Sequence, residues 1–255
     1  MKIVVLVKEV PDPNALRLDP RTGQLQPGTP TVANEYDLYG MEAAVSLREA
    51  GHDVEIVVAS LGSGRDPVNR CLAMGADRAV VIDDPQLSGG DSLSTAKVLA
   101  EFLRQEGFDL LFLGQEASDS ATGDIGPRLA AMLDLPVVSN LIDLQLNDGT
   151  LTLKREIEDG HQTVSVSPPV ILCALSGLPD PRYPSLKGIM ASRKKQTEVK
   201  TAADLGIDSG VPDSVVSWGD LFIEEQEAQG IIIEEEDIDQ AVDQLIAFLE
   251  EKKLI

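Results

Sequence analysis

The residues best suited to chemistry lie between a short apolar run and the helical pattern that follows it. Residues 109–113 (DLLFL) predict a buried strand, and a helix begins near Asp124. Between them, from Gly114 to Gly123, most residues are small or polar. A helix N-terminus carries unpaired N–H groups and a partial positive charge, and small side chains let a ligand approach the backbone. The junction therefore predicts a nucleotide or phosphate site, with a plain tight strand–helix turn as the alternative.

This junction lacks the glycine spacing of the standard nucleotide motifs, because neither GxGxxG nor a GxxxxGK loop occurs there. The cysteines, Cys71 and Cys173, and the histidines, His52 and His161, show no metal-ligand spacing. Cys173 lies in an apolar run that favours a buried thiol, and both histidines lie in turn-like sequence. We therefore expect no metal site and no Ser/His/Asp or Cys/His constellation, that is, a chain that is not an enzyme on its own.

The composition limits the partners. The net charge of −22 would repel nucleic acid and anionic membranes, and an aromatic content of 4% leaves few platforms for stacking bases. No apolar run approaches the ~18 residues that a membrane span needs, and no signal peptide precedes the first strand. We expect a soluble, cytoplasmic protein with no direct membrane insertion.

Apolar runs alternate with helical patterns over the first half of the chain, which predicts an α/β fold with a doubly wound, mostly parallel sheet. Residues 18–33 are rich in Pro, Gly and Thr and predict an irregular excursion. The expected strands are Lys2–Val7, Asp53–Ala59, Arg78–Ile82 and Asp109–Leu113, and helices begin at Asn34, Asp66, Asp91 and near Asp124. Ligands bind beyond the carboxyl ends of such strands. The corresponding loops are 8–14, 60–65 and 114–123.

The second half predicts a β-hairpin insertion. Strand patterns at 137–146, 151–157 and 162–166 are separated by the turn pairs Asp148-Gly149 and Asp159-Gly160. Residues 168–175 could return to the sheet. From Ser176 the chain is irregular, up to a short helix at 201–206, where we place the end of the main domain.

Residues 207–255 predict a C-terminal arm. It combines a strand, Gly230–Ile233, with a helix from about Asp237 whose apolar residues recur at helical spacing: Ile238, Val242, Leu245, Ile246 and Leu249. A strand and one amphipathic helix cannot bury themselves alone, so the arm packs on the main domain or on a partner. We favour a partner.

Seven segments occur in the order typical of one known family. They are residues 2–11 (KIVVLVKEVP), 19–23 (DPRTG), 34–44 (NEYDLYGMEAA), 72–78 (LAMGADR), 114–127, 154–156 (KRE) and 181–195 (PRYPSLKGIMASRKK). Together they span almost the whole chain, which resembles the beta subunit of electron transfer flavoproteins, a family that includes the FixA proteins. The resemblance implies a Rossmann-like fold of the adenine nucleotide alpha-hydrolase type.

The resemblance also implies a function. Such a subunit forms a heterodimer with an alpha subunit, and FAD carries electrons from primary dehydrogenases, such as the acyl-CoA dehydrogenases of fatty acid beta-oxidation, to a membrane quinone oxidoreductase or another acceptor. The alpha subunit holds most of the FAD, and the beta subunit binds a structural AMP. In electron-bifurcating relatives a second FAD takes the place of AMP. A nucleotide-binding regulator or hydrolase of the same fold is the alternative, although residues 7–11 lack the Gly/Ser motif that a hydrolase needs.

Carried onto this chain, the family's nucleotide contacts are Leu6, Asn34, Glu35, Tyr36, Asp37, Leu61, Gly114, Gln115, Glu116, Ala117, Ser118, Asp119, Ser120, Ala121, Thr122, Gly123, Asp124 and Ile125. Several have ordinary alternatives. Asn34 is also placed to cap a helix, Asp37 to favour its dipole, and Asp119 to fix its own turn.

The family docks its dehydrogenase through a recognition loop, here residues 179–195. The contact residues implied are Tyr183, Leu186, Ile189 and Met190, with Leu186 as an anchor that enters a pocket of the dehydrogenase. The alternative is a leucine folded onto its own domain. The basic residues 193–195 would be a solvated turn, or would hold the loop or the alpha subunit.

The chain departs from the family at the nucleotide loop. A frequent family form is Asp-x-Asp-x-x-Gln-x-Gly-Pro, whereas Ala121 and Asp124 replace the second Asp and the Gln here. Bifurcating members favour a glycine where this chain has Ser120. We therefore expect AMP in preference to a second FAD. An acid at position 124 beside a phosphate must be offset by the helix N-terminus, a cation or water.

Overall fold

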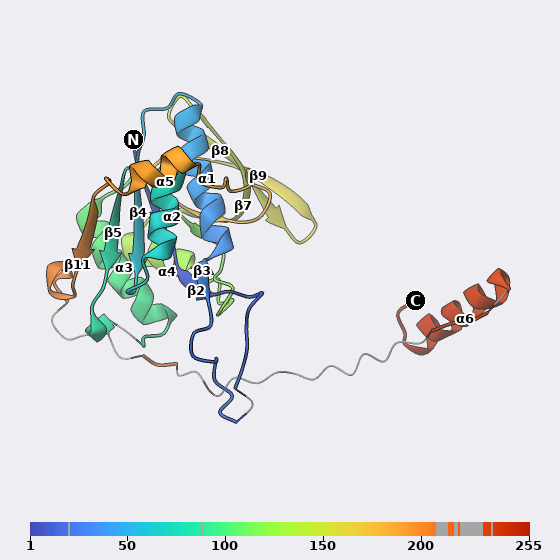
Figure 1. Ribbon diagram of the computed structural model, residues 1–255. Coiled ribbons are helices and arrows are strands. Elements are labelled where there is room, and N and C mark those ends of the chain that lie inside the picture. Colours follow the sequence, from blue (N-terminus) through green and yellow to red (C-terminus); the bar gives the residue numbers. More distant parts are fainter. Residues whose placement is uncertain (20, 88, 208–213, 217–218, 220–231, 236) are drawn as a thin grey trace. The chain divides into compact units, whose positions relative to one another are not determined.

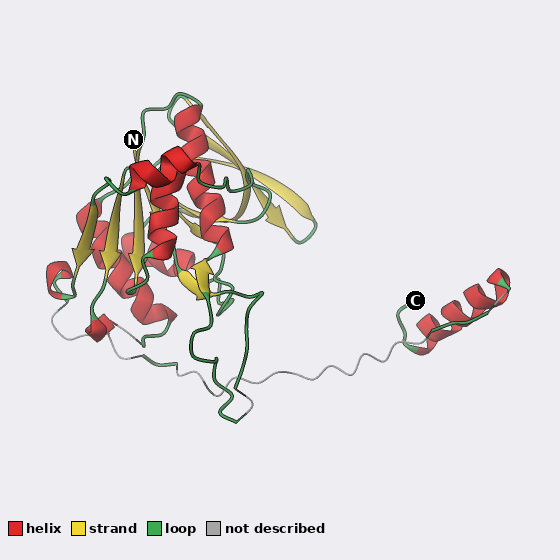
Figure 2. Ribbon diagram, viewed as in Figure 1, coloured by secondary structure: helices red, strands yellow, loops and turns green. Residues whose placement is uncertain are grey.

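The computed structural model describes residues 1–255 except 20, 88, 208–213, 217–218, 220–231 and 236 (Figures 1 and 2). The chain divides into two compact units, residues 1–220 and residues 221–255. The sequence patterns place this boundary earlier, between residues 206 and 207.

The first unit is built on a nine-stranded sheet in the order β11-β5-β4-β1-β6-β10-β7-β8-β9. Neighbours from β11 to β7 are parallel, and β8 and β9 extend the sheet as antiparallel hairpins. This confirms the predicted fold class and the hairpin insertion. The strands are β1 (Lys2–Leu6), β4 (Glu55–Leu61), β5 (Arg78–Ile82), β6 (Leu110–Gly114), β7 (Val137–Asn147), β8 (Thr150–Ile157), β9 (Gly160–Val166), β10 (Val170–Ala174) and β11 (Thr197–Lys200).

Each face of the sheet carries its own core, because successive side chains of a strand point to opposite faces. In β1, Ile3 and Val5 belong to one buried cluster and Val4 and Leu6 to the other. The first face is covered by α1 (Glu35–Glu49) and α2 (Asp66–Met74), and the second by α3 (Ser92–Glu106) and α4 (Ile125–Leu133), as Figure 1 shows. A strand that is buried on both faces must be apolar throughout, which explains the continuous apolar runs.

The strand order reverses at β1. From β1 the chain builds outward through β4 and β5, and then crosses back through α3 to place β6 on the other side of β1. The switch point of this doubly wound sheet therefore lies between the carboxyl ends of β1 and β6, at Leu6 and Gly114. Ligands of open parallel sheets bind at such a point.

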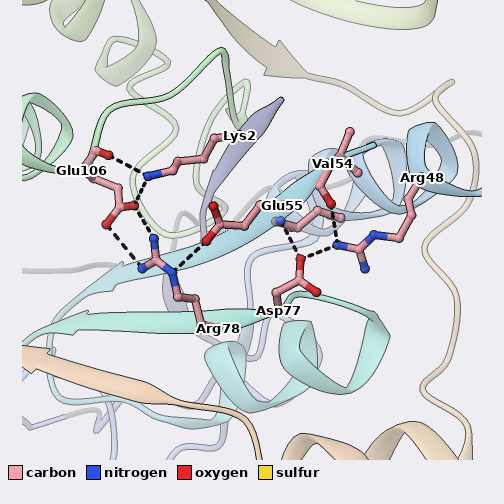
Figure 3. A network of polar contacts seen from close by, with 8 residues as sticks. Lys2, Arg48, Val54, Glu55, Asp77, Arg78 and Glu106 are labelled. Atoms are coloured by element: carbon pink, nitrogen blue, oxygen red, sulfur yellow. Dashed lines mark hydrogen bonds and ion pairs between the residues drawn. The ribbon is translucent and has the colours of Figure 1, made fainter. Parts of the chain in front are cut away.

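The opposite, amino-terminal edge is held by an ion-pair network (Figure 3). The Lys2 ammonium lies 2.9 Å from a carboxylate oxygen of Glu106, and Arg78 pairs with the same carboxylate. Arg78 Nε also donates to Glu55 at 3.0 Å. These contacts tie the starts of β1, β4 and β5 to the end of α3, and leave the carboxyl edge for the loops.

The prediction of an irregular excursion over residues 18–33 is wrong at its end. Strand β3 (Thr31–Ala33) pairs antiparallel with β2 (Glu9–Pro11), with Val10 opposite Val32. A second short pairing joins Leu18 to Leu25. The pairing partner of β3 lies about twenty residues earlier in the chain, so the local composition gave no sign of it.

The prediction of irregular chain from Ser176 holds as far as residue 185 but is wrong beyond it, where the chain forms the helix α5 (Leu186–Ser192) and strand β11. Ser185 caps α5 by accepting a hydrogen bond from the Gly188 N–H at 3.0 Å. A Cβ on Gly188 would lie 2.4 Å from the carbonyl oxygen of Ala73, so the glycine lets α5 pack closely on α2. The predicted short helix at 201–206 is a 3₁₀ helix, Ala203–Leu205, and Pro85–Leu87 forms another.

In the second unit, α6 (Ile238–Glu251) confirms the predicted helix, and the Asp237 side chain caps it through the N–H groups of Asp239 and Gln240. The predicted strand lies partly outside the described residues, and its described part, Ile232 and Ile233, is not a strand.

Candidate functional site

A cavity of about 460 Å³ lies at the carboxyl edge of the sheet, at the switch point. Most of the residues expected to bind the nucleotide line it: Leu6, Asn34, Asp37, Leu61, Gly114, Gln115, Glu116, Ala117, Ser120, Thr122, Gly123, Asp124 and Ile125. The expected residues that lie outside its lining are Glu35, Tyr36, Ser118, Asp119 and Ala121.

The cavity is also lined by Lys8, from the predicted ligand loop 8–14, and by residues that the sequence did not indicate, above all Gly90, Asp91, Ser92 and Arg128. Residues 90–92 follow β5, whose carboxyl end reaches the same edge as those of β1, β4 and β6. The loop after β5 therefore belongs to the site for the same reason as the loops after β1, β4 and β6.

Asp37 joins the ends of the two central strands. Its buried carboxylate accepts hydrogen bonds from the Lys8 N–H at 2.8 Å and from the Gly114 N–H at 2.7 Å. Burial raises the pKa of Asp37 to about 6, although these hydrogen bonds oppose the rise. A Cβ on Gly114 would lie 2.6 Å from Asp37 Oδ1 and 2.7 Å from Tyr36 Cβ, so this position requires glycine. Asp37 thus shapes the floor of the site and does more than favour the helix dipole.

Asn34 stands at the N-cap position of α1, but its side chain does not cap the helix. Its Nδ2 donates to the Glu116 carbonyl at 2.9 Å, and its Oδ1 accepts from the Ser118 N–H at 3.1 Å. The prediction that the Asn34 side chain caps the helix is therefore wrong. The amide instead holds the loop after β6 against the start of α1.

Asp119 accepts a hydrogen bond from the Lys8 ammonium at 2.7 Å. This ion pair links the loop after β1 to the loop after β6. The alternative that Asp119 only fixes its own turn does not describe the structure, since its partner comes from 111 residues earlier.

The backbone N–H groups of residues 122–125 donate no hydrogen bond to any described part of the chain, and all four residues line the cavity. They lead into α4, whose first turn adds the N–H of Gly126 and the positive end of the helix dipole. This edge of the cavity can therefore bind an anion through its backbone.

Asp124 is held by two side chains. Its Oδ2 accepts from Ser92 Oγ at 2.7 Å and from Arg128 Nε at 2.6 Å. Partial burial alone would raise the pKa of Asp124. The hydrogen bonds outweigh this effect and hold the pKa below its ordinary value. Its other oxygen, Oδ1, is buried and has no hydrogen-bond partner among the described residues. Arg128 is thus the cation that offsets the acid at position 124.

Asp91 caps α3 as predicted, by accepting hydrogen bonds from the Ser94 N–H and Ser94 Oγ, each at 2.8 Å. Its second oxygen accepts from the Val215 N–H at 2.9 Å and the Val216 N–H at 3.3 Å. These bonds hold the pKa of Asp91 well below its usual range. Val216, which the sequence patterns assign to the arm, lines the cavity.

The cysteines and histidines lie outside the cavity lining. Cys71 and Cys173 are buried, and burial raises the pKa of both thiols to about 12, so they stay protonated. Within the described ranges, no group of three or more His, Cys, Asp and Glu side chains could hold a metal ion. None of the described helices is long and apolar enough to cross a membrane.

The residues expected to bind a partner gather around α5. Tyr183, Leu186, Ile189 and Met190 are 90%, 82%, 40% and 70% exposed. We call these four residues the α5 apolar surface. They are not on a flexible loop, since three of them belong to the helix, and Lys195 fixes its far end by donating to the carbonyls of Leu72 and Ala76 at 2.9 and 2.6 Å.

Known proteins with similar sequences carry consistent names. The electron transfer flavoprotein subunit beta of Thermoanaerobacterium thermosaccharolyticum is 36% identical over 85% of this chain and 87% of that protein. The subunit of the same name from Megasphaera elsdenii is 31% identical over 97% and 98%. Subunit CarD of the caffeyl-CoA reductase-Etf complex of Acetobacterium woodii is 30% identical over the full length of both.

The sheet and its switch-point cavity define a Rossmann-like α/β protein with a ligand site at the carboxyl edge of the strands. Residues 25–205 match the family model described as the electron transfer flavoprotein domain. The chain therefore belongs to the electron transfer flavoprotein family, among the beta subunits. Membership implies electron transfer and association with flavin.

Proposed function

We propose that this chain is the beta subunit of a heterodimeric electron transfer flavoprotein that binds AMP in its switch-point cavity. The alpha subunit holds most of the redox FAD. The beta subunit contributes no catalytic constellation of its own, and its tasks are to bind the nucleotide, to pack on the alpha subunit and to dock the dehydrogenase in the cytoplasm.

The observation that carries the nucleotide assignment is the row of unpaired N–H groups at residues 122–125, which borders a cavity at the switch point of the sheet. Such a row is suited to a phosphate. The unpartnered Oδ1 of Asp124 can in addition accept a hydrogen bond from a hydroxyl or from water. The residues present therefore fit a nucleotide.

Two further features support the assignment of a dehydrogenase and an alpha subunit as partners. The α5 apolar surface offers a contiguous group of exposed side chains for a flavin-containing dehydrogenase, from which electrons would pass to a membrane quinone oxidoreductase or another acceptor. Helix α6 carries an exposed apolar stripe, formed by Ile238, Val242, Leu245 and Ile246, for the alpha subunit.

The experiment is to purify the alpha–beta complex, release its bound nucleotides by denaturation, and identify and count them. One FAD and one AMP per complex would support the proposal. Two FAD and no AMP would replace it with the electron-bifurcating alternative, in which a second FAD takes this site. A colourless complex without flavin would contradict both assignments.

A further inference from the structure

We propose that Arg128 is the side chain that binds the phosphate of the nucleotide, and that Asp124 holds Arg128 in place for this task. The inference rests on the proposed function, since it takes the cavity to be the nucleotide site. It adds a cation to the backbone N–H groups that border the site.

The described lining of the cavity contains two basic side chains, Lys8 and Arg128. The Lys8 ammonium is engaged by Asp119 at 2.7 Å. Among the acidic residues of the lining, Asp37 and Asp91 accept hydrogen bonds from backbone N–H groups, and Asp124 is paired with Arg128 itself. Since Lys8 is paired with Asp119, Arg128 is the cation of the described lining that has donors left for a ligand.

Arg128 is held by one side of its guanidinium only. Its Nε donates to Asp124 Oδ2 at 2.6 Å, and Ser92 fixes the same oxygen from α3 at 2.7 Å. The two terminal nitrogens of Arg128 have no hydrogen-bond partner in the part of the chain that the structure describes. A guanidinium offers five N–H donors in a planar fork, so four remain for a ligand.

A phosphate is the group that this arrangement fits. Two parallel N–H donors match two phosphate oxygens, and the pairing is directional as well as charged. Arg128 follows the row of N–H groups at residues 122–125 by one helical turn, so both kinds of donor border the same cavity. Asp124 alone would repel the phosphate, but paired with Arg128 it orients the fork.

The test compares AMP with adenosine, which lacks the phosphate. Affinities are measured by calorimetry on the alpha–beta complex after its nucleotide has been removed, for the parent and for Arg128→Met. We expect the variant to bind AMP about 10- to 100-fold more weakly, as for the loss of a charged hydrogen-bonded contact, and to bind adenosine as the parent does. Added salt should weaken AMP binding in the parent more than in the variant.

The matched control is Arg104→Met. Arg104 is also paired with a carboxylate on a helix surface, but it lies outside the cavity lining, and its substitution should leave both affinities unchanged. Equal AMP binding by the parent and Arg128→Met would overturn the role of Arg128, while the nucleotide site itself would stand. An equal loss of AMP and adenosine would also overturn it, since Arg128 would then only shape the cavity. A parent complex that binds neither ligand would refute the proposed function and this inference together.

Discussion

Arg182 forms a hydrogen-bonded ion pair with Glu42, which lies 140 residues earlier in the chain. Arg182 Nε lies 2.9 and 3.0 Å from the two carboxylate oxygens of Glu42, and Nη2 lies 2.6 Å from one of them. Glu42 is only 4% exposed, and the same guanidinium also binds Glu49. Its hydrogen bonds to Glu49 and Glu42 raise the pKa of Arg182 above its ordinary range. The segment that leads into α5 is therefore fixed to α1.

Substitution of Arg182 should loosen this attachment. Arg182→Met leaves the Glu42 carboxylate buried without its cation, which we expect to destabilise the protein by about 2 kcal/mol, at the low end for a buried pair because Arg182 is partly exposed. Hydrogen exchange of the α5 amides should accelerate. Arg193→Met is the control, since Arg193 has no ion pair within the described residues. Equal exchange of α5 in both variants would show that Arg182 does not fix the segment.

Asp37 should make stability depend on pH. Its pKa is about 6 in the folded protein and 3.8 in the unfolded chain, so the folded state holds the proton more tightly. The Asp37 contribution to stability is therefore fully present below pH ~4, falls as pH rises towards ~6, and is then constant. Between about pH 4.5 and pH 7.5 we expect the free energy of unfolding of the parent to fall relative to Asp37→Asn by on the order of 2 kcal/mol. Urea unfolding at several pH values measures this, and parallel pH profiles would contradict it.

The sequence predicts well those strands and helices whose pattern of apolar residues follows from their burial. Strands β1, β4, β5 and β6 are apolar on both faces, and the order of strands and helices then limits the topology. Strand β11 was not predicted because it lies at the edge of the sheet and has alternate residues exposed. Helix α5 was not predicted because it is short and begins two residues after Pro184. Their structure comes from β5 and α2, which local sequence does not reveal.

The same contrast applies to the site. The loop after β6 was predictable, because a strand–helix junction with small residues has a recognisable composition. The roles of Asn34 and Asp119 were not, because each binds a loop that is distant in sequence. Asp124 and Arg128 are an exception. Their i, i+4 spacing on one helix was a readable signal for an ion pair.

The second unit should be needed for assembly. Helix α6 exposes Ile238, Val242, Leu245 and Ile246, and burying each of them on the alpha subunit would contribute about 1.5–3 kcal/mol before ordering costs. Deletion of residues 221–255 keeps the contacts of residues 215–216 with Asp91 and should leave the first unit folded. We expect the dissociation constant for the alpha subunit to rise at least 100-fold in analytical ultracentrifugation.

Point substitutions separate the apolar stripe from the rest of α6. Leu245→Gln should weaken the association, whereas Asp243→Ala, which changes an exposed polar residue, should not. An unchanged dissociation constant for both the deletion and Leu245→Gln would show that α6 is not an intersubunit clamp.

Leu186 should determine how long a dehydrogenase stays docked. It lies at the start of α5 and is 82% exposed, although Arg182 and Lys195 hold the segments on either side of it. An exposed leucine on a fixed helix can enter a partner's pocket without first being ordered, which lowers the entropic cost of binding. Leu186→Ala should cost about 1 kcal/mol or more of docking energy, a fivefold or larger weakening, without loss of flavin or of the heterodimer.

The effect should appear in the concentration dependence of flavin reduction by the dehydrogenase and not in the rate at saturation, because the anchor governs the lifetime of the encounter and not the redox step. Leu205→Ala is the control. Leu205 is 3% exposed in the core beneath α3, so its truncation should destabilise the fold by about 2–5 kcal/mol and leave docking unchanged. If Leu186→Ala docks and transfers electrons like the parent, the α5 apolar surface is not the dehydrogenase site, and its exposure must be explained by another partner.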